Sequence, residues 1–410
     1  MKDEKKAPKL RFKGFTDDWE QCKLGTLFDF KNGLNKGKEF FGSGVPIVNY
    51  MDINKNVIIN ADMVKGRVKL NEDEIERFAV KDNDLFFTRT SETSEEIGFT
   101  AAITYAAKNT VFSGFILRAR PILKLNSEFY AYYLRTMHKR NDIIRHSSIT
   151  TRALTSGSLL STMTVSYPAI GEQNRISYIL RKIDSTITLH EEKKSQLERL
   201  KSTLLQKMFA DKSGYPAVRF SNFGDKWKQY KLSDIGEIVT GSTPPRQHPE
   251  YYSDNGVLWV TPTDITDNLI SDTAKKLSVS GTRAGQVVPA GSILVTCIAS
   301  IGKNALLLTE GSFNQQINCI VPNSNKFDSY FLLTESFNWL DPMRRIAGAG
   351  TMQIVNKNNF SKINTFIPEL EEQIVIGNIF SKLDSLIALY KQKIEKINIL
   401  KQWLLQNMFI

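Results

Sequence analysis

The sequence contains the same long segment twice. Residues 168–210 and 368–410 share 18 identities in 43 aligned positions, at a constant offset of 200 residues. Each copy begins with a proline and a Glu-Gln pair, continues with Ile-x-x-Ile-x-x-Lys-(Ile/Leu)-Asp-Ser, and closes with Leu-Leu-Gln-x-Met-Phe. Unrelated segments of this length would match at roughly 3 positions, so the chain carries an internal duplication.

A second repeated motif precedes each of these segments. The pattern Pro-x-x-Arg-Phe-x-x-Phe-x-x-x-Trp begins at Pro8 and again at Pro216, an offset of 208 residues. Because the offset falls from 208 to 200, the stretch between the two motifs is shorter by a net 8 residues in the second copy. The repeating unit therefore has a constant beginning, a divergent middle and a constant end, which predicts one frame that holds two different binding regions.

The repeated segments predict two long helices that pair with each other. In the second copy the apolar residues follow a 3,4 spacing that is interrupted at Lys393, namely Ile376, Ile379, Leu383, Leu386, Tyr390, Ile397, Leu400 and Leu404. Such spacing over about four heptads is typical of a coiled coil, and a helix of about 38 residues spans about 57 Å. Antiparallel pairing within the chain suits the connectivity best, because a globular region separates the two segments.

The divergent middles, 25–167 and 233–367, predict mixed α/β domains of one fold with altered loops. Short β-rich runs are bounded by Gly, Pro, Asn and Asp, and helical patterns occur near 128–139 and 327–339. We therefore expect a mixed α/β protein with an internal two-fold repeat, in which a long antiparallel two-helix coiled coil separates two globular domains. The predicted division is 1–167 and 211–367 for the globular domains, and 168–210 and 368–410 for the helices.

Composition narrows the class of protein. The net charge of +11 favours a polyanionic partner, and the first 170 residues hold +6 of it whereas residues 211–370 hold +1. The three cysteines form no Cys-x-x-Cys pair and the four histidines no His-x-x-x-His pair, so we expect reduced thiols and no metal. The sequence shows no signal peptide or apolar run of membrane-spanning length, which predicts a soluble, cytoplasmic protein.

Candidate DNA contacts gather in the loops of the middles. Cations and hydroxyls crowd the stretch from Arg135 to Arg152, and both suit phosphate oxygens and base edges. A basic helix face that is only solvated remains the alternative. The full candidate set is Lys36, Lys38, Arg89, Thr90, Ser91, Arg140, Arg145, Ser148, Thr150, Thr151, Arg152, Thr243, Arg246, Gln247, Ser300, Lys303, Arg344, Arg345, Thr351 and Gln353.

The sequence carries no signature of catalysis. The Pro-Pro at 244–245 lacks the acid or amide before it and the aromatic after it that an amino-methyltransferase tetrapeptide needs. The stretch 33–39 is one residue short of a phosphate loop, with Glu39 in place of its Ser or Thr. No Gly-x-Ser-x-Gly is present. We therefore expect no catalytic residue and no cofactor in this chain.

The tandem arrangement of both motifs over 8–410 resembles the specificity subunit of type I restriction-modification enzymes, a host-defence system. The resemblance implies that each middle is a target-recognition domain that reads one half of a split double-stranded DNA site. It also implies that the repeated helices bind two adenine-methyltransferase subunits, which carry S-adenosylmethionine. Restriction subunits, joined through the complex, would add Mg²⁺- and ATP-dependent translocation and cleavage.

The surface expected to bind these partners lies on the repeated helices. Apolar residues off the coiled-coil seam need a cover, which is either the chain's own domains or another protein. The candidates are Glu172, Gln173, Ile187, Leu189, Glu372, Gln373, Ile387, Leu389 and Trp403. A coiled-coil scaffold whose end domains bind proteins rather than DNA remains the alternative function. The base sequence that would be read is not encoded in any motif.

Overall fold

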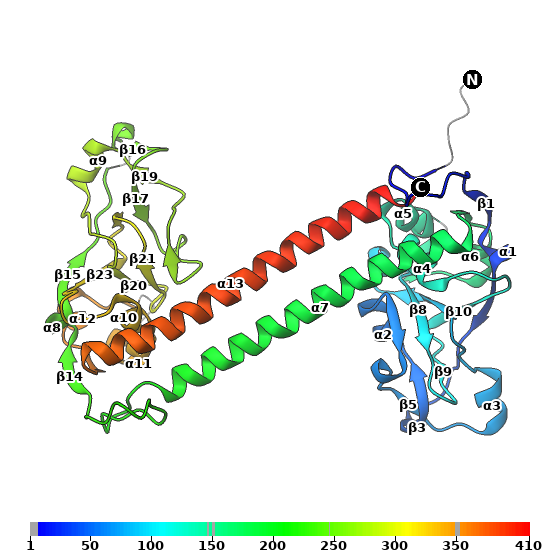
Figure 1. Ribbon diagram of the computed structural model, residues 1–410, viewed down its shortest axis with the longest axis horizontal. Helices are drawn as coiled ribbons and strands as arrows, with labels where there is room; N and C mark the ends of the chain where they lie inside the picture. Colours follow the sequence, from blue (N-terminus) through cyan, green and yellow to red (C-terminus); the bar gives the residue numbers. More distant parts are fainter. Residues whose placement is uncertain (1–6, 146, 150–151, 246, 349–352) are drawn as a thin grey trace. The chain divides into compact units, whose positions relative to one another are not determined.

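A computed structural model describes residues 7–145, 147–149, 152–245, 247–348 and 353–410. The chain divides into two compact units (Figure 1). Unit 1 comprises residues 1–191 and 392–410, and unit 2 comprises residues 192–391. Each unit therefore contains one globular region together with one part of each long helix.

Unit 1 is built on a five-stranded sheet with the order β2-β10-β6-β8-β4, antiparallel except for the β4–β8 pair. Its central strand β6 reads Leu-Phe-Phe-Thr and is buried on both faces, as its unbroken apolar run predicts. The strands are β1 Glu20–Lys23, β2 Phe28–Asn32, β3 Phe41–Val48, β4 Ile58–Asn60, β5 Arg67–Val68, β6 Leu85–Thr88, β7 Thr90–Ser91, β8 Thr100–Tyr105, β9 Val111–Phe112, β10 Ile116–Pro121, β11 Ser148–Ile149, β12 Ala153–Leu154 and β13 Thr164–Tyr167. The helices are α1 Leu24–Leu27, α2 Tyr50–Lys55, α3 Glu72–Arg77, α4 Ser127–Tyr133, α5 Met137–Arg145 and α6 Gly157–Ser161.

Unit 2 repeats this architecture with different loops. Its sheet order, β15-β23-β20-β21-β18, matches that of unit 1 strand for strand, including the single parallel pair at one edge. The strands are β14 Lys228–Lys231, β15 Gly236–Thr240, β16 Tyr252–Ser253, β17 Val257–Val260, β18 Leu269–Ile270, β19 Lys276–Leu277, β20 Ile293–Thr296, β21 Asn304–Leu307, β22 Gly311–Phe313, β23 Ile317–Pro322 and β24 Asn364–Ile367. The helices are α8 Leu232–Ile235, α9 Val279–Ala284, α10 Ser329–Glu335, α11 Leu340–Ala347 and α12 Lys357–Ser361.

The two repeated segments form single helices, α7 Ile170–Lys207 and α13 Leu370–Asn407. In unit 1 Lys401 forms an ion pair with Asp184 at 2.6 Å, and in unit 2 Lys201 forms one with Asp384 at 2.5 Å. The residue that comes later in α7, Lys201, pairs with the residue that comes earlier in α13, Asp384. This is the order expected of antiparallel helices. The predicted mixed α/β class with an antiparallel coiled coil and an internal repeat is confirmed. The four residue ranges given for domains and helices stay a prediction.

One predicted helix is divided in two. The stretch 128–139 is not continuous, because α4 ends at Tyr133 and α5 begins at Met137. At the break, the guanidinium of Arg135 donates hydrogen bonds to the carbonyls of Thr100, Ile53 and Asn56. In unit 2 the corresponding stretch continues from α10 as a 3₁₀ turn, Ser336–Trp339, before α11.

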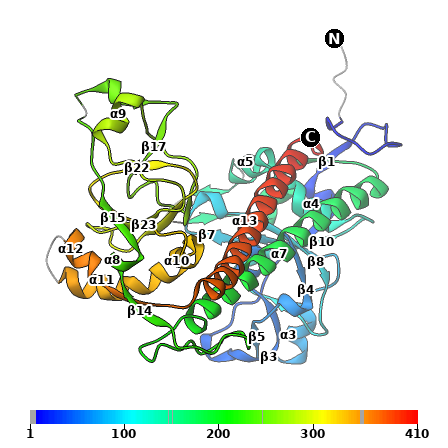
Figure 2. The same cartoon turned by 60° about the vertical axis from the view of Figure 1, so that its left-hand side comes forward.

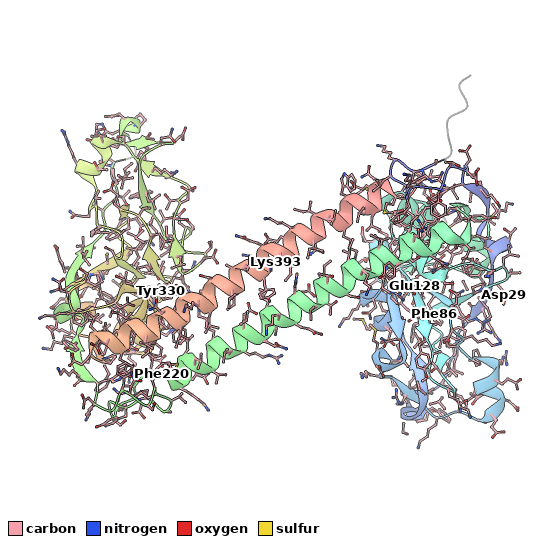
Figure 3. The ribbon with its side chains drawn as sticks, viewed as in Figure 1. Asp29, Phe86, Glu128, Phe220, Tyr330 and Lys393 are labelled. Atoms are coloured by element: carbon pink, nitrogen blue, oxygen red, sulfur yellow. The ribbon has the colours of Figure 1, made fainter. Side chains whose placement is uncertain are left out.

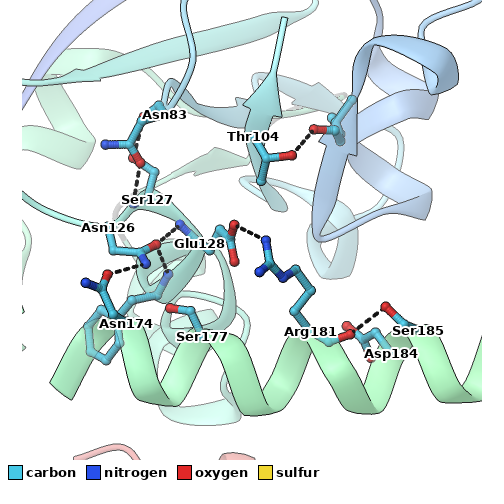
Figure 4. A network of polar contacts seen from close by, with 12 residues as sticks. Asn83, Thr104, Asn126, Ser127, Glu128, Asn174, Ser177, Arg181, Asp184 and Ser185 are labelled. Atoms are coloured by element: carbon cyan, nitrogen blue, oxygen red, sulfur yellow. Dashed lines mark hydrogen bonds and ion pairs between the residues drawn. The ribbon is translucent and has the colours of Figure 1, made fainter. Parts of the chain in front are cut away.

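In each unit a short helix forms polar contacts with one of the long helices. The side chain of Asn126 caps α4 and donates to Asn174 of α7 at 2.8 Å, while Arg181 donates to Glu128 at 3.0 Å (Figure 4). In unit 2 the start of α13 lies beside α10 (Figure 2). The hydroxyl of Tyr330, a residue labelled in Figure 3, donates to the carboxylate of Asp384 at 2.8 Å. These contacts fix the orientation of each globular region on its own helix segments.

The helix ends complete the two hydrophobic cores. Phe409, which follows α13, stacks on Tyr133 and packs against Trp19 in unit 1. Phe209, which follows α7, packs edge-to-face against Trp227 and at a tilt against Phe331 in unit 2. The repeated Met-Phe pair therefore packs the end of each long helix into a hydrophobic core.

Candidate nucleic-acid interface

The Gln of the Glu-Gln pair at the start of each long helix forms hydrogen bonds within its own unit. The amide of Gln173 accepts from the backbone N–H of Asn126 at 3.0 Å and donates to the carbonyl of Pro168 at 2.8 Å. Gln373 repeats both contacts with Asp328 and Pro368. All four acidic and amide side chains, Glu172, Gln173, Glu372 and Gln373, are buried. Their expected contact with a partner stays a prediction, and the role seen here is intramolecular.

The predicted basic stretch separates into buried and exposed cations. Lys139 is 7% exposed and donates to the carbonyl of Thr164. Arg140 donates to the carbonyls of Glu95 and Ile97, and burial lowers its pKa to about 10. Nη2 of Arg140 is therefore bonded to the backbone of a neighbouring loop, and the predicted contact of Arg140 with DNA stays a prediction.

The exposed members of the stretch remain candidates for DNA. Arg145 keeps 78% of its side chain exposed, with Asp142 at 4.0 Å, and Ser148 and Arg152 are also exposed. Thr150 and Thr151 lie outside the described residues. Long, solvated cations next to hydroxyls can reach phosphate oxygens at little desolvation cost.

Pairing between two strands that are distant in the sequence places Arg152 close to the candidate DNA contacts Thr90 and Ser91. Strand β7, which is Thr90 and Ser91, pairs with β12, which directly follows Arg152. The preceding Arg89 is half-buried and donates to the carbonyl of Gly114 at 3.3 Å. The loop beyond β7 and the residue before β12 thereby line one cleft of about 540 Å³. The lining consists of Tyr50, Thr90, Ser91, Glu92, Thr93, Glu96, Phe115 and Arg152.

Tyr50, Glu96 and Phe115 line the cleft but were absent from the predicted set, as were Glu92 and Thr93. Glu96 accepts a hydrogen bond from the hydroxyl of Tyr50 at 3.0 Å, and the ring of Phe115 is 62% exposed. The residue types of Glu96, Tyr50 and Phe115 do not indicate a DNA-binding site, because carboxylates and aromatic rings are not typical contacts to phosphate. The run of polar residues from 89 to 96 was the available hint.

The remaining predicted residues of unit 1 lie elsewhere in the unit. Lys36 forms an ion pair with Glu74 at 2.6 Å and lies over the ring of Phe40. Lys38, at the start of a 3₁₀ turn, is exposed. Neither residue lines the cleft.

The predicted residues of unit 2 lie on several loops and on the helix α11. Thr243 bonds Gln315, and Gln247 is exposed. Ser300 is exposed in the loop after β20, while Lys303 donates to the carbonyl of Pro262 at 3.1 Å. Two more exposed cations, Arg344 and Arg345, lie on α11, and the carbonyl of Gln353 accepts from the N–H of Ala299. The predicted residues Arg246 and Thr351 lie outside the described residues.

The helices retain exposed apolar side chains. Leu189 is 62% exposed, Trp403 49% and Leu389 43%, whereas Ile187 is 9% exposed and Ile387 is half-buried. Three of the predicted partner contacts are thus accessible within their own units.

Among the residues that the structure describes, no cluster of three or more His, Cys, Asp or Glu could hold a metal ion. No helix in the described part of the chain is long and apolar enough to cross a membrane. All three cysteines are free thiols, and burial raises the pKa of Cys297 to about 11.

Comparison with known families gives a match over most of the chain. The model of the family described as "Type I restriction modification DNA specificity domain" matches residues 16–199 and again residues 224–398. The two matches coincide with the two copies of the repeat and with the paired sheet topologies described above.

Individual relatives agree. The type I restriction enzyme HindI specificity subunit of Haemophilus influenzae is 31% identical over 149 residues, 35% of this chain and 32% of that protein. The MjaIX specificity subunit of Methanocaldococcus jannaschii is 26% identical over 196 residues, 45% of this chain and 44% of that protein. The aligned parts therefore span less than half of these relatives. The crystal structure of a type I restriction-modification S subunit from M. genitalium matches 98% of this chain and 99% of its own with a TM-score of 0.67, at 14% identity, which shows a common fold.

Proposed function

The chain belongs to the family of type I restriction-modification DNA specificity domains, which it contains twice, and we propose that it is the non-catalytic specificity subunit of a restriction-modification complex. It binds double-stranded DNA and selects the sequence that the complex methylates. The observation that carries this proposal is one fold present twice with different loops. A shared scaffold with altered loop side chains is how one fold serves two specificities.

The target that fits this architecture is bipartite. Each unit presents its own set of exposed polar side chains, including Arg145 and Arg152 in unit 1 and Ser300 and Arg344 in unit 2. Because α7 and α13 each run from one unit into the other, the distance between two half-sites would be set by helix length. A continuous helix is stiff over such a length, so a fixed gap of unread base pairs follows.

The proposed partners are two methyltransferase subunits and, through them, restriction subunits. Exposed Leu189, Leu389 and Trp403 supply apolar docking surface, and tryptophan is a frequent anchor of protein interfaces. S-adenosylmethionine, Mg²⁺ and ATP would be bound by those subunits. The complex would work in the cytoplasm, where its DNA is.

Two measurements test the proposal. Binding of the full chain to duplex DNA should weaken steeply with salt, because contacts to phosphate release counterions. Genome-wide mapping of methylated adenine in cells with and without the chain should reveal a split motif that depends on it. Salt-insensitive DNA binding together with an unchanged methylation map would contradict the proposal and favour a protein-binding scaffold.

A further inference from the structure

The two units fix one loop with the same backbone contacts. In unit 1 the hydroxyl of Thr88 donates to the carbonyl of Glu96 and accepts from the N–H of Phe99, both at 2.8 Å. In unit 2 the hydroxyl of Thr296 donates to the carbonyl of Ser300 and accepts from the N–H of Lys303. The loop between these contacts, which we call the reading loop, is residues 89–97 in unit 1 and 297–301 in unit 2.

The first residue of each reading loop, Arg89 or Cys297, forms equivalent backbone hydrogen bonds in the two units. The N–H of Arg89 donates to the carbonyl of Phe115 at 2.9 Å, as that of Cys297 donates to Gln316 at 2.8 Å. The carbonyl of Arg89 accepts from Thr155, and that of Cys297 from Val355.

The end of each reading loop is fixed by a glycine with positive φ, 64° at Gly98 and 87° at Gly302. A Cβ at Gly98 would come within 2.4 Å of Ile143, and one at Gly302 within 2.0 Å of Leu340. Both glycines therefore permit the loop to rest on the following helix.

Within this common frame the side chains differ, apart from the isoleucine that precedes each glycine, Ile97 and Ile301. The loop of unit 1 is four residues longer and carries Glu92, Glu95 and Glu96, whereas that of unit 2 reads Cys-Ile-Ala-Ser-Ile. The place of the exposed Phe115 is taken by Gln316 in unit 2, according to the matching backbone contacts. Identical anchoring with otherwise different side chains is what a specificity element requires, since the position of the loop is constant and the chemistry of its other side chains varies.

The carboxylate of Glu96 is held in a defined orientation in the cleft of unit 1. It accepts from the hydroxyl of Tyr50 at 3.0 Å, and that hydroxyl in turn accepts from the amide of Asn54 at 3.3 Å. From the other side, Arg140 holds the carbonyls of Glu95 and Ile97. A carboxylate fixed in this way has a free oxygen that can accept one further hydrogen bond.

We propose that the cleft bounded by the reading loop of unit 1 recognises one G·C base pair, with Glu96 accepting from the cytosine amino group and Arg152 donating to guanine. This rests on the proposed function. A carboxylate near DNA is repelled by phosphates and gains only from an amino group on a base edge, and cytosine N4 is the usual partner of Glu in the major groove. Arginine pairs with guanine O6 and N7. Phe115 supplies apolar contact beside the pair.

The test uses the full chain co-expressed with its methyltransferase subunits, with the methylated motif read by sequencing of host DNA. Glu96→Gln should relax the preference at one G·C position in one half of the motif by about ten- to a hundredfold. Tyr50→Phe should relax the same position by a smaller factor, because it frees the carboxylate without removing it. The other half of the motif should be unchanged in both variants.

Glu95→Gln is the matched control. It removes the same charge from the same loop, yet Glu95 does not line the cleft, so the motif should be retained. An unchanged motif in active Glu96→Gln, or an equal change in Glu95→Gln, would overturn this inference and leave the proposed function intact. A wild-type complex that methylates no sequence motif would overturn both.

Discussion

Arg11 donates two hydrogen bonds to the carboxylate of Glu172, from Nε at 2.9 Å and from Nη2 at 2.7 Å. Arg219 makes the same two bonds to Glu372 at 2.7 Å each. The side chains of Glu172 and Glu372 are 1% and 2% exposed, so both ion pairs are largely buried. Each pair connects the Pro-x-x-Arg-Phe motif of one repeat to the start of the long helix of the same repeat. The hydrogen bond to Glu172 raises the pKa of Arg11.

Arg11→Ala should destabilise the chain by about 3–5 kcal/mol, because it leaves Glu172 buried without its cation. Urea unfolding measures this change. Arg199→Ala, on an exposed position of α7, removes the same side chain and should change stability by less than about 0.5 kcal/mol. A loss below about 1 kcal/mol for Arg11→Ala would show that the pair does not hold the helix.

Glu335 gives unit 2 a pH-dependent stability. Burial raises the pKa of its carboxyl to about 7, and the side chain contacts Thr365 and Asn338. A carboxyl whose pKa is raised in the folded state contributes stability below its unfolded value near 4.5, and this contribution disappears as pH rises through about 7. The free energy of unfolding of the wild type should therefore fall by about 2–3 kcal/mol between pH 4.5 and 8 because of the ionisation of Glu335.

The Glu335→Gln variant should lack that part of the pH dependence. Unfolding free energies at pH 5 and pH 8 measure it, with Glu310→Gln, an exposed position of unit 2, as the control. Equal pH dependence in wild type and Glu335→Gln would show that Glu335 does not titrate between these values.

The divergent middles should be portable. Replacement of 25–167 by the equivalent region of a relative should change one half of the methylated motif, since the sheet order and the reading-loop anchors are shared between units. Methylation mapping of the chimaera gives the result. A simultaneous change in both halves would mean that the two units do not read independently.

Leu389→Asp and Trp403→Ala should each weaken binding of the methyltransferase subunits by about tenfold or more, because both remove exposed apolar surface. Affinity can be followed by titration calorimetry. Lys396→Ala, also exposed on α13, serves as the control. Unchanged affinity in both variants would place the docking surface away from these side chains.

Insertion of four residues after Lys194 and again after Ile394 should lengthen the unread gap of the motif by one or two base pairs. Four residues add about 6 Å and just over one helical turn, so the apolar seam is nearly kept. Insertion in α7 alone should instead lower stability, because Asp184–Lys401 and Lys201–Asp384 cannot then both form. An active double insertion with the original gap would show that the helices do not set the spacing.

The sequence alone determined the repeat, the two long helices and the mixed α/β class. Helix pairing leaves a local trace, since apolar residues must return every three or four positions to the same face. Duplication leaves a trace at a fixed offset, and the ion pairs Asp184–Lys401 and Asp384–Lys201 follow that offset of 200.

The tertiary structure alone decided which polar side chains are available. Arg140 and Arg145 look alike in the sequence, yet one holds loop carbonyls and the other is exposed. Likewise Glu96 meets Tyr50, 46 residues earlier, only because the sheet places α2 beside the reading loop. Burial and hydrogen-bond partners depend on contacts between distant segments, and no local pattern of residue types records them.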